Sequence, residues 1–175
     1  MTVNQALIAE LQMESSNTRK LMERIPEGQN SWKNHEKSMA LGNIVSHICE
    51  LPGWITMTLN TSELDLATMS YKPNIAETNS DLLAMFDNEL NKAVEALGNA
   101  GDEEFSKMWT LRRGNHIMFT MPKIAVIRSM ALNHLYHHRG QLTVYLRLLD
   151  IPIPGMYGPS ADDIIVAKQA AAQAN

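Results

Sequence analysis

Four long stretches of this 175-residue chain carry apolar side chains at the three- and four-residue spacing of an amphipathic helix. Helices that are apolar along one face must bury that face against one another. The pattern therefore restricts the chain to a core of packed helices. We expect these helices to cover residues 4–25, 38–60, 79–98 and 122–149.

The connections between these stretches predict how the helices are arranged. Residues 61–78 are polar and aperiodic, and a connection of that length lets the second and third helices run parallel. Residues 108–119 could form a short hairpin around a glycine turn, and residues 160–163 resemble a capping box before a short last helix. We therefore expect an all-α protein: a four-helix bundle with a long crossover between helices 2 and 3, plus a short C-terminal helix, in one domain over residues 1–175.

Helix boundaries follow from a few residues with strong local preferences. Pro52 lies inside the second stretch, where it removes a backbone hydrogen bond and predicts a kink. Pro122 suits the first turn of the fourth helix. Asn79 or Ser80 could cap the third helix.

Charge and apolar run length exclude two classes of partner. The chain has 15 basic and 19 acidic residues, a net charge of −4, so few phosphates could be neutralised and we expect no specific nucleic-acid partner. No stretch approaches the roughly 18 apolar residues of a membrane span. The single cysteine, Cys49, cannot form an internal disulfide. We expect a soluble cytoplasmic protein without a membrane partner.

Histidines are concentrated in the fourth stretch. His134 and His138 differ by about 40° around a helix and so share one face. His47 follows the apolar stripe of the second helix and should point inward as well. Three imidazoles around an open position would make a reactive metal site, whereas an isolated pair is often only hydrogen-bonded or exposed to solvent. His137 is a rival ligand, because it lies about 60° from His134.

Three segments of the chain resemble the DinB-like (damage-inducible) family of metal-binding four-helix bundles. The strongest of them combines the HxxxHRGQL pattern with one upstream histidine. The segments are residues 32–54 (WKNHEKSMALGNIVSHICELPGW), 132–147 (LNHLYHHRGQLTVYLR) and 154–162 (PGMYGPSAD).

The resemblance implies a ligand set, a metal and a partner. It makes His47, His134 and His138 the metal ligands and favours His138 over His137. It implies a divalent metal ion, nickel or zinc, and a homodimer. It also implies that a low-molecular-weight thiol such as bacillithiol, mycothiol or glutathione takes part in the reaction.

Such a centre could activate a nucleophile from outside the chain. Three neutral donors leave the metal its full charge, which lowers the pKa of a bound thiol or water. Cys49 lies about 200° around the helix from His47 and should point away from the site. We expect a metal-dependent enzyme that activates a small thiol, of the S-transferase or isomerase type, for a small-molecule substrate. The alternatives are a metal-dependent hydrolase that activates water and a non-catalytic metal-binding protein of the stress response.

Four residues near the histidines have two interpretations each. Gln141 could hydrogen-bond an imidazole or make a polar packing contact. Arg139 is expected to pair with an acid on a neighbouring helix, and Tyr145 to pack in the core. Tyr157, in the loop after the fourth helix, either lines the site entrance or packs elsewhere. The 12 methionines are expected to fill the core, with a pliable pocket wall as the alternative.

Overall fold

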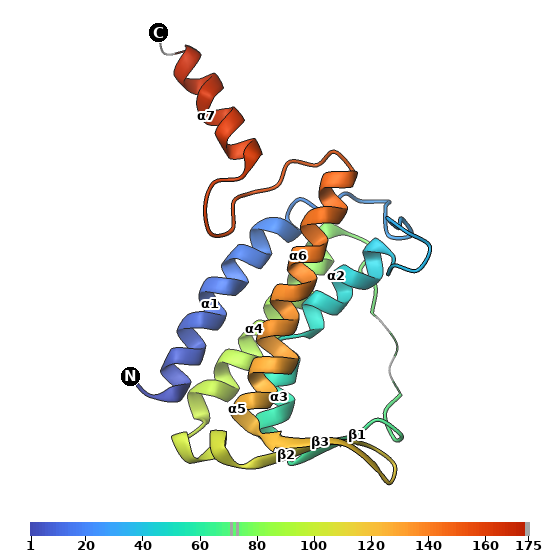
Figure 1. Ribbon diagram of the computed structural model, residues 1–175, viewed down its shortest axis with the longest axis vertical. Coiled ribbons are helices and arrows are strands. Elements are labelled where there is room, and N and C mark those ends of the chain that lie inside the picture. The colour runs from blue at the N-terminus through green and yellow to red at the C-terminus, as the bar shows by residue number, and fades with distance from the viewer. Residues whose placement is uncertain (71, 73, 174–175) are drawn as a thin grey trace.

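The fold is seen in a computed structural model that describes residues 1–70, 72 and 74–173 (Figure 1). Residues 71 and 73 of the expected crossover and residues 174–175 of the expected domain lie outside the described part. The helices are α1 (Val3–Met22), α2 (Leu41–Glu50), α3 (Gly53–Asn60), α4 (Asn79–Asn99), α5 (Lys123–Val126), α6 (Asn133–Leu148) and α7 (Ala161–Gln173). A 3-10 turn (Asp102–Ser106) follows α4, and a π-helical turn (Ile127–Leu132) joins α5 to α6.

The four-helix bundle is confirmed, with α1, α2–α3, α4 and α5–α6 as its members. Helix α4 contacts α1, α2 and α3, and α2 contacts α6. The colour gradient of Figure 1, which follows the chain from the N-terminus, shows that α2–α3 and α4 run in the same direction. Helices α1 and α6 run in the opposite direction. Leucine and isoleucine side chains from all four members fill the space between them; Leu11, Ile48, Phe86 and Leu142 are each at most 1% exposed.

Proline divides the second member of the bundle. Glu50 ends α2 and Gly53 begins α3, while Leu51 and Pro52 between them keep right-handed helical dihedral angles. The amides of Trp54 and Ile55 donate to carbonyls three residues back, at 3.2 and 3.0 Å. The backbone therefore forms the tighter hydrogen bonds of a 3-10 turn here. The predicted kink is therefore a break of two residues just after His47.

A small sheet closes one end of the bundle and was only partly predicted. Strand β2 (Met108–Arg113) and strand β3 (His116–Pro122) form the expected antiparallel hairpin around Gly114, whose φ of +57° favours glycine. Strand β1 (Glu63–Asp65), from the region expected to be an aperiodic crossover, pairs in parallel with β2. The protein is mostly helical, but it is not purely α.

Several helix ends differ by a few residues from the sequence prediction. Helix α1 ends three residues before Ile25, and Pro122 ends β3 so that α5 begins at Lys123. The cap of α4 is Thr78 rather than Asn79 or Ser80, because its hydroxyl accepts from the Asp81 amide.

Helix α7 projects away from the bundle (Figure 1). None of its described residues is buried. The predicted capping box is present: the Ser160 hydroxyl accepts from the Asp163 amide at 3.0 Å, and the Asp163 carboxylate accepts from the Ser160 amide at 2.9 Å. Among the described residues, no helix combines the length and apolarity that crossing a bilayer requires.

Candidate metal centre

Three histidine side chains converge between α2 and α6. His47 comes from α2, and His134 and His138 come from successive turns of α6. The Nε2 atom of His134 lies 3.4 Å from that of His47 and 2.9 Å from that of His138. One ligand atom from each residue lies within 4.8 Å of the other two. The three residues that the sequence placed on inward faces are thus brought together.

The local sequence explains why these rings face one another. Ile44, Ile48 and Leu51 are buried on α2, and His47 shares their side of the helix. On α6, Leu135 and Leu142 are buried around the histidine turn. Packing of these apolar side chains fixes the two helices, and the imidazoles converge between them.

Two neighbouring groups orient the histidine rings. The Nδ1 atom of His138 lies 2.8 Å from the amide oxygen of Gln141, so Nδ1 carries the proton and donates it to that oxygen. The backbone of Met130 hydrogen-bonds the ring of His134, and Met130 lies in the π-helical turn. Groups that hold one ring nitrogen in this way direct the other toward a metal. Of the two interpretations of Gln141, the hydrogen bond to an imidazole is therefore confirmed.

Burial keeps the three rings neutral. It lowers the pKa of His47 to about 4, with smaller contributions from the neighbouring His138 and His134. Burial is also the main reason why the pKa values of His134 and His138 are lowered. Neutral imidazole is the form that binds metal, so the lone pairs remain available at neutral pH.

The spacing of the three nitrogens fits a first-row divalent cation. Two ligand nitrogens at about 2.0–2.1 Å from a zinc ion, in tetrahedral geometry, lie roughly 3.3 Å apart. The observed separations of 3.4 and 2.9 Å bracket this value. Imidazole donors suit both zinc and nickel, so the donor set fits either metal.

His137 and Cys49 lie outside this group. His137 is exposed, and its ring meets that of His138 at a centroid distance of 4.9 Å. The Cys49 thiol is buried against the carbonyl of Leu82 at 3.5 Å, and burial raises its pKa to about 12. The thiol therefore faces α4 rather than the histidines, as its position around α2 predicts.

An open cavity of about 550 Å³ adjoins His47. Its apolar wall comes from α3 and from the segment that contains β1: Trp54, Met57, Leu64, Leu66 and Met69. The described polar groups around it are His47, Glu50, Ser70 and Lys72. Sequence reasoning did not find this wall. The available signal was the alternation of Glu63, Leu64, Asp65 and Leu66, which is the period of a strand.

A second polar cluster, formed by Glu14, Arg139 and Tyr157, lies beside His138. The Arg139 guanidinium pairs with the Glu14 carboxylate at 2.7 Å, and both side chains are at most 6% exposed. The Tyr157 hydroxyl donates to the same carboxylate at 2.7 Å. Arg139 thus has the predicted acidic partner on a neighbouring helix. Tyr157 ties the loop after α6 to α1, so of its two interpretations the structural one applies.

Tyr145 also has the expected structural role. It is 5% exposed, and its ring meets Trp32 edge-on at a centroid distance of 5.6 Å. Its hydroxyl donates to the Met39 carbonyl at 2.9 Å.

Comparison with known proteins agrees with this architecture. The DinB family model matches residues 1–169. An uncharacterized protein of Bacillus subtilis strain 168, YrdA, is 26% identical over 152 residues, which cover 87% of this chain and 86% of YrdA.

Two crystal structures share the fold. The DinB-like protein YjoA of Bacillus subtilis has a TM-score of 0.66 at 18% identity and covers 84% of this chain and 96% of its own. A DinB-like protein of Bacillus cereus ATCC 10987 has a TM-score of 0.67 at 19% identity, with coverage of 87% and 97%. At these identities the likeness concerns the fold, but the family match spans nearly the whole chain, and the chain therefore belongs to the DinB family.

Proposed function

We propose that this protein binds one divalent metal ion, nickel or zinc, through His47, His134 and His138, and is an enzyme that activates a low-molecular-weight thiol. The observation that carries the proposal is the convergence of three neutral Nε2 atoms beside an open cavity. Uncompensated polar groups held together inside a protein are costly, and a cation would compensate them.

The residues around the histidines supply orientation and a dry environment. Bound to three neutral donors, the metal would keep its full charge and lower the pKa of a thiol or water toward neutrality. Gln141 holds His138 in the tautomer whose Nε2 is free, and the Met130 backbone orients His134. The apolar side chains of Trp54 and Met57 limit the water around a substrate in the adjoining cavity.

The state of Cys49 supports a nucleophile from outside the chain. A thiol needs to be ionised to attack, and the Cys49 thiol has a pKa raised to about 12 by burial. It is also directed at the Leu82 carbonyl rather than at the histidines. A thiol from outside the chain, held at the metal, would be ionised and would lie at the histidines, whereas the Cys49 thiol is neither ionised nor directed at them.

A water nucleophile is the second candidate, and the charge of the cavity favours it. Glutathione, mycothiol and bacillithiol are polar thiols, and a carboxylate-bearing one gains from a cationic partner. Among the described residues around the cavity, Lys72 is the single cation, and the wall is mainly apolar. A hydrolase acting on an apolar ester or amide would need no anion-binding group.

Turnover measurements separate these proposals. Zinc- and nickel-loaded protein would be assayed with each of the three thiols and an aryl chloride, and without thiol on an aryl ester. Thiol attack on the chloride-bearing carbon would release chloride and form a thioether. Thiol-dependent turnover that is lost in His134→Ala and kept in Cys49→Ala supports the first proposal. Turnover of the ester without thiol supports the hydrolase, and neither reaction in fully metallated protein supports a non-catalytic metal-binding role.

We also propose that the protein is a homodimer. Helix α7 has 13 residues and exposes Ile164, Ile165 and Val166 by 43–63%, and an isolated helix of this length is marginal in water. Val144 and Leu148 on α6 are exposed by 52% and 58%. Pairing with a second copy would cover such side chains. Light scattering at micromolar concentration should give about 39 kDa, twice 19.6 kDa, and a mass of one chain would contradict the proposal.

A further inference from the structure

The cavity beside His47 has a composition that suits one class of ligand. Trp54 and Met57 of α3 line it together with Leu64 and Leu66 of the β1 segment, and all four pack against the buried cluster of Trp109, Leu111 and Val126. Small-molecule sites are typically concave, mostly apolar and about 300–1,000 Å³ in volume, with a few polar groups at one place. This cavity, of about 550 Å³, has that size and a mainly apolar lining, and its described polar groups are His47, Glu50, Ser70 and Lys72.

We propose that these four apolar side chains form a binding subsite for the alkyl or aryl portion of the substrate. The inference rests on the proposed function in one respect, because the polar, reacting end of the ligand is placed at the three histidines. The subsite itself is a property of the chain without metal.

Alternation along the β1 segment separates its two faces. Leu64 and Leu66 face the cavity, while Glu63 and Asp65 point to the other side of the strand. Leu64 is in register with Leu111 of β2, which is 4% exposed. The apolar wall is therefore a continuation of the core under the sheet.

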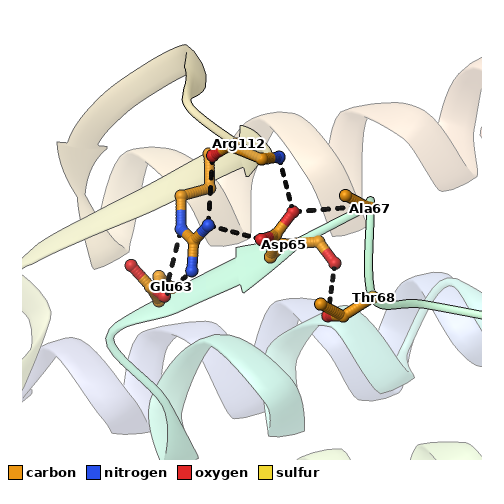
Figure 2. A network of polar contacts seen from close by, with 6 residues as sticks. Glu63, Asp65, Ala67, Thr68 and Arg112 are labelled. Carbon is orange, nitrogen blue, oxygen red and sulfur yellow. Dashed lines mark hydrogen bonds and ion pairs between the residues drawn. The ribbon is translucent and has the colours of Figure 1, made fainter.

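An ion-pair network on the outer face holds this wall in place (Figure 2). The Arg112 guanidinium reaches from β2 to the carboxylate of Glu63, at 2.6 Å, and to that of Asp65. The Asp65 carboxylate also accepts from the amides of Gly114 at 2.8 Å and Ala67 at 2.9 Å. These hydrogen bonds hold the pKa of Asp65 below its usual range. Arg112 is thus a positioning residue that joins β1 to the hairpin.

The α3 part of the wall is held by a fully buried tryptophan. Trp109 is 0% exposed, and its indole nitrogen donates to the Thr61 hydroxyl at 2.9 Å. Its ring meets that of Trp54 edge-on at a centroid distance of 6.3 Å. Trp54 and the β1 segment are therefore held in place without a ligand, which lowers the entropy lost on binding.

Methyl spectra of the methionines can test the subsite without any reaction. Protein labelled at the methionine methyl groups would be titrated with 1-alkanols from butanol to heptanol, both zinc-loaded and treated with EDTA. We expect the Met57 resonance to shift and saturate, with affinity rising roughly fourfold for each added methylene. The resonances of Met13 and Met118, exposed on α1 and β3, should not move.

Matched variants locate the effect on the wall. Leu66→Gln should weaken heptanol binding by roughly tenfold because it places a polar group in the apolar wall. Ile117→Gln changes a side chain on the same sheet that is 59% exposed and should leave binding unchanged. Equal melting temperatures of the two variants would show that the loss is local. If Leu66→Gln melts early, Leu66→Met keeps the wall apolar and should restore binding.

The outcomes distinguish this inference from the proposed function. Alkanol binding by a protein that takes up no metal would support the subsite and contradict the metal enzyme. Metal binding without a chain-length-dependent Met57 shift would overturn the subsite and leave the metal centre standing. A shift that is equal in wild type and Leu66→Gln would also overturn it.

Discussion

Two polar clusters each include one of two adjacent residues of α6, His138 and Arg139, and they are built in opposite ways. In the cluster of Glu14, Arg139 and Tyr157, each charge has an opposite charge or a hydrogen-bond partner within it. The cluster of His47, His134 and His138 consists of three groups of one kind whose Nε2 atoms face each other. The first is complete as it stands, so its role is structural. The second could hold a metal ion, so it is the candidate for function.

The largest expected effect is loss of metal from the histidine cluster. His138→Ala should reduce metal content from about one ion per chain to nearly none, because two nitrogens bind a divalent cation much less tightly than three. His137→Ala is the matched control, since the ring of His137 is exposed and lies outside the group of three histidines. Elemental analysis checks both variants. Loss of metal from His137→Ala alone would assign the ligands differently.

The second effect concerns the completed cluster and stability. Arg139→Met leaves the Glu14 carboxylate buried without its cation, and the free energy of unfolding should fall by about 3–5 kcal/mol. The double variant Glu14→Met with Arg139→Met should recover most of this loss, since an apolar pair replaces the ion pair. Urea unfolding measures the change. A loss below about 1 kcal/mol in the single variant would place this pair among weak surface pairs.

The third effect is smaller and tests the orientation of one ring. Gln141→Leu removes the oxygen that accepts from Nδ1 of His138 and should weaken metal binding by about 10- to 100-fold. Gln141→Glu keeps an acceptor at this position and should retain most of the affinity. Competition with a chromophoric chelator gives both values. Unchanged affinity in Gln141→Leu would show that the contact does not orient the ring for the metal.

The smallest effect is the pH dependence of the metal-free protein. The pKa of His47 is lowered from about 6.5 to about 4 in the folded state, and those of His134 and His138 are lowered as well. The unfolded chain therefore binds more protons between about pH 6.5 and pH 4, so stability decreases as pH falls through this window and is retained above it.

Urea unfolding in EDTA at several pH values would measure this decrease. His47→Ala should show a shallower slope than wild type, because one of the three imidazoles is gone. Identical slopes in wild type and His47→Ala would mean that His47 does not resist protonation.

Local periodicity explains why so much of the fold could be predicted. The apolar stripes identified the four members of the bundle, and the four-residue spacing of His134 and His138 placed them on one face. Pro52 and the capping box at Ser160 act through backbone hydrogen bonds with near neighbours. Each of these signals depends on residues within a few positions along the chain.

The features that sequence reasoning missed depend on distant residues. Strand β1 has three residues and pairs with a strand more than 40 positions later, where Arg112 forms ion pairs with Glu63 and Asp65, so much of what holds it lies far along the chain. The sequence left two places open for Tyr157, and a hydrogen bond to Glu14 on α1 fixes its position. Residues 127–132 have an ordinary helical pattern, and nothing local indicated the π-helical turn.

The π-helical turn before His134 sets the phase of the helix that carries the histidines. Its hydrogen bonds span five residues instead of four, so it contains one more residue than a regular turn. Each residue turns a helix by about 100°, so deleting one here would keep the segment helical but rotate the sheet end relative to the histidine face. A relative that lacks the turn would align with a one-residue gap inside a continuous helix, between Pro122 and His134. Such a gap would indicate that the cavity wall lies at a different angle to the three histidines, even where the residues of the wall and the histidines are the same.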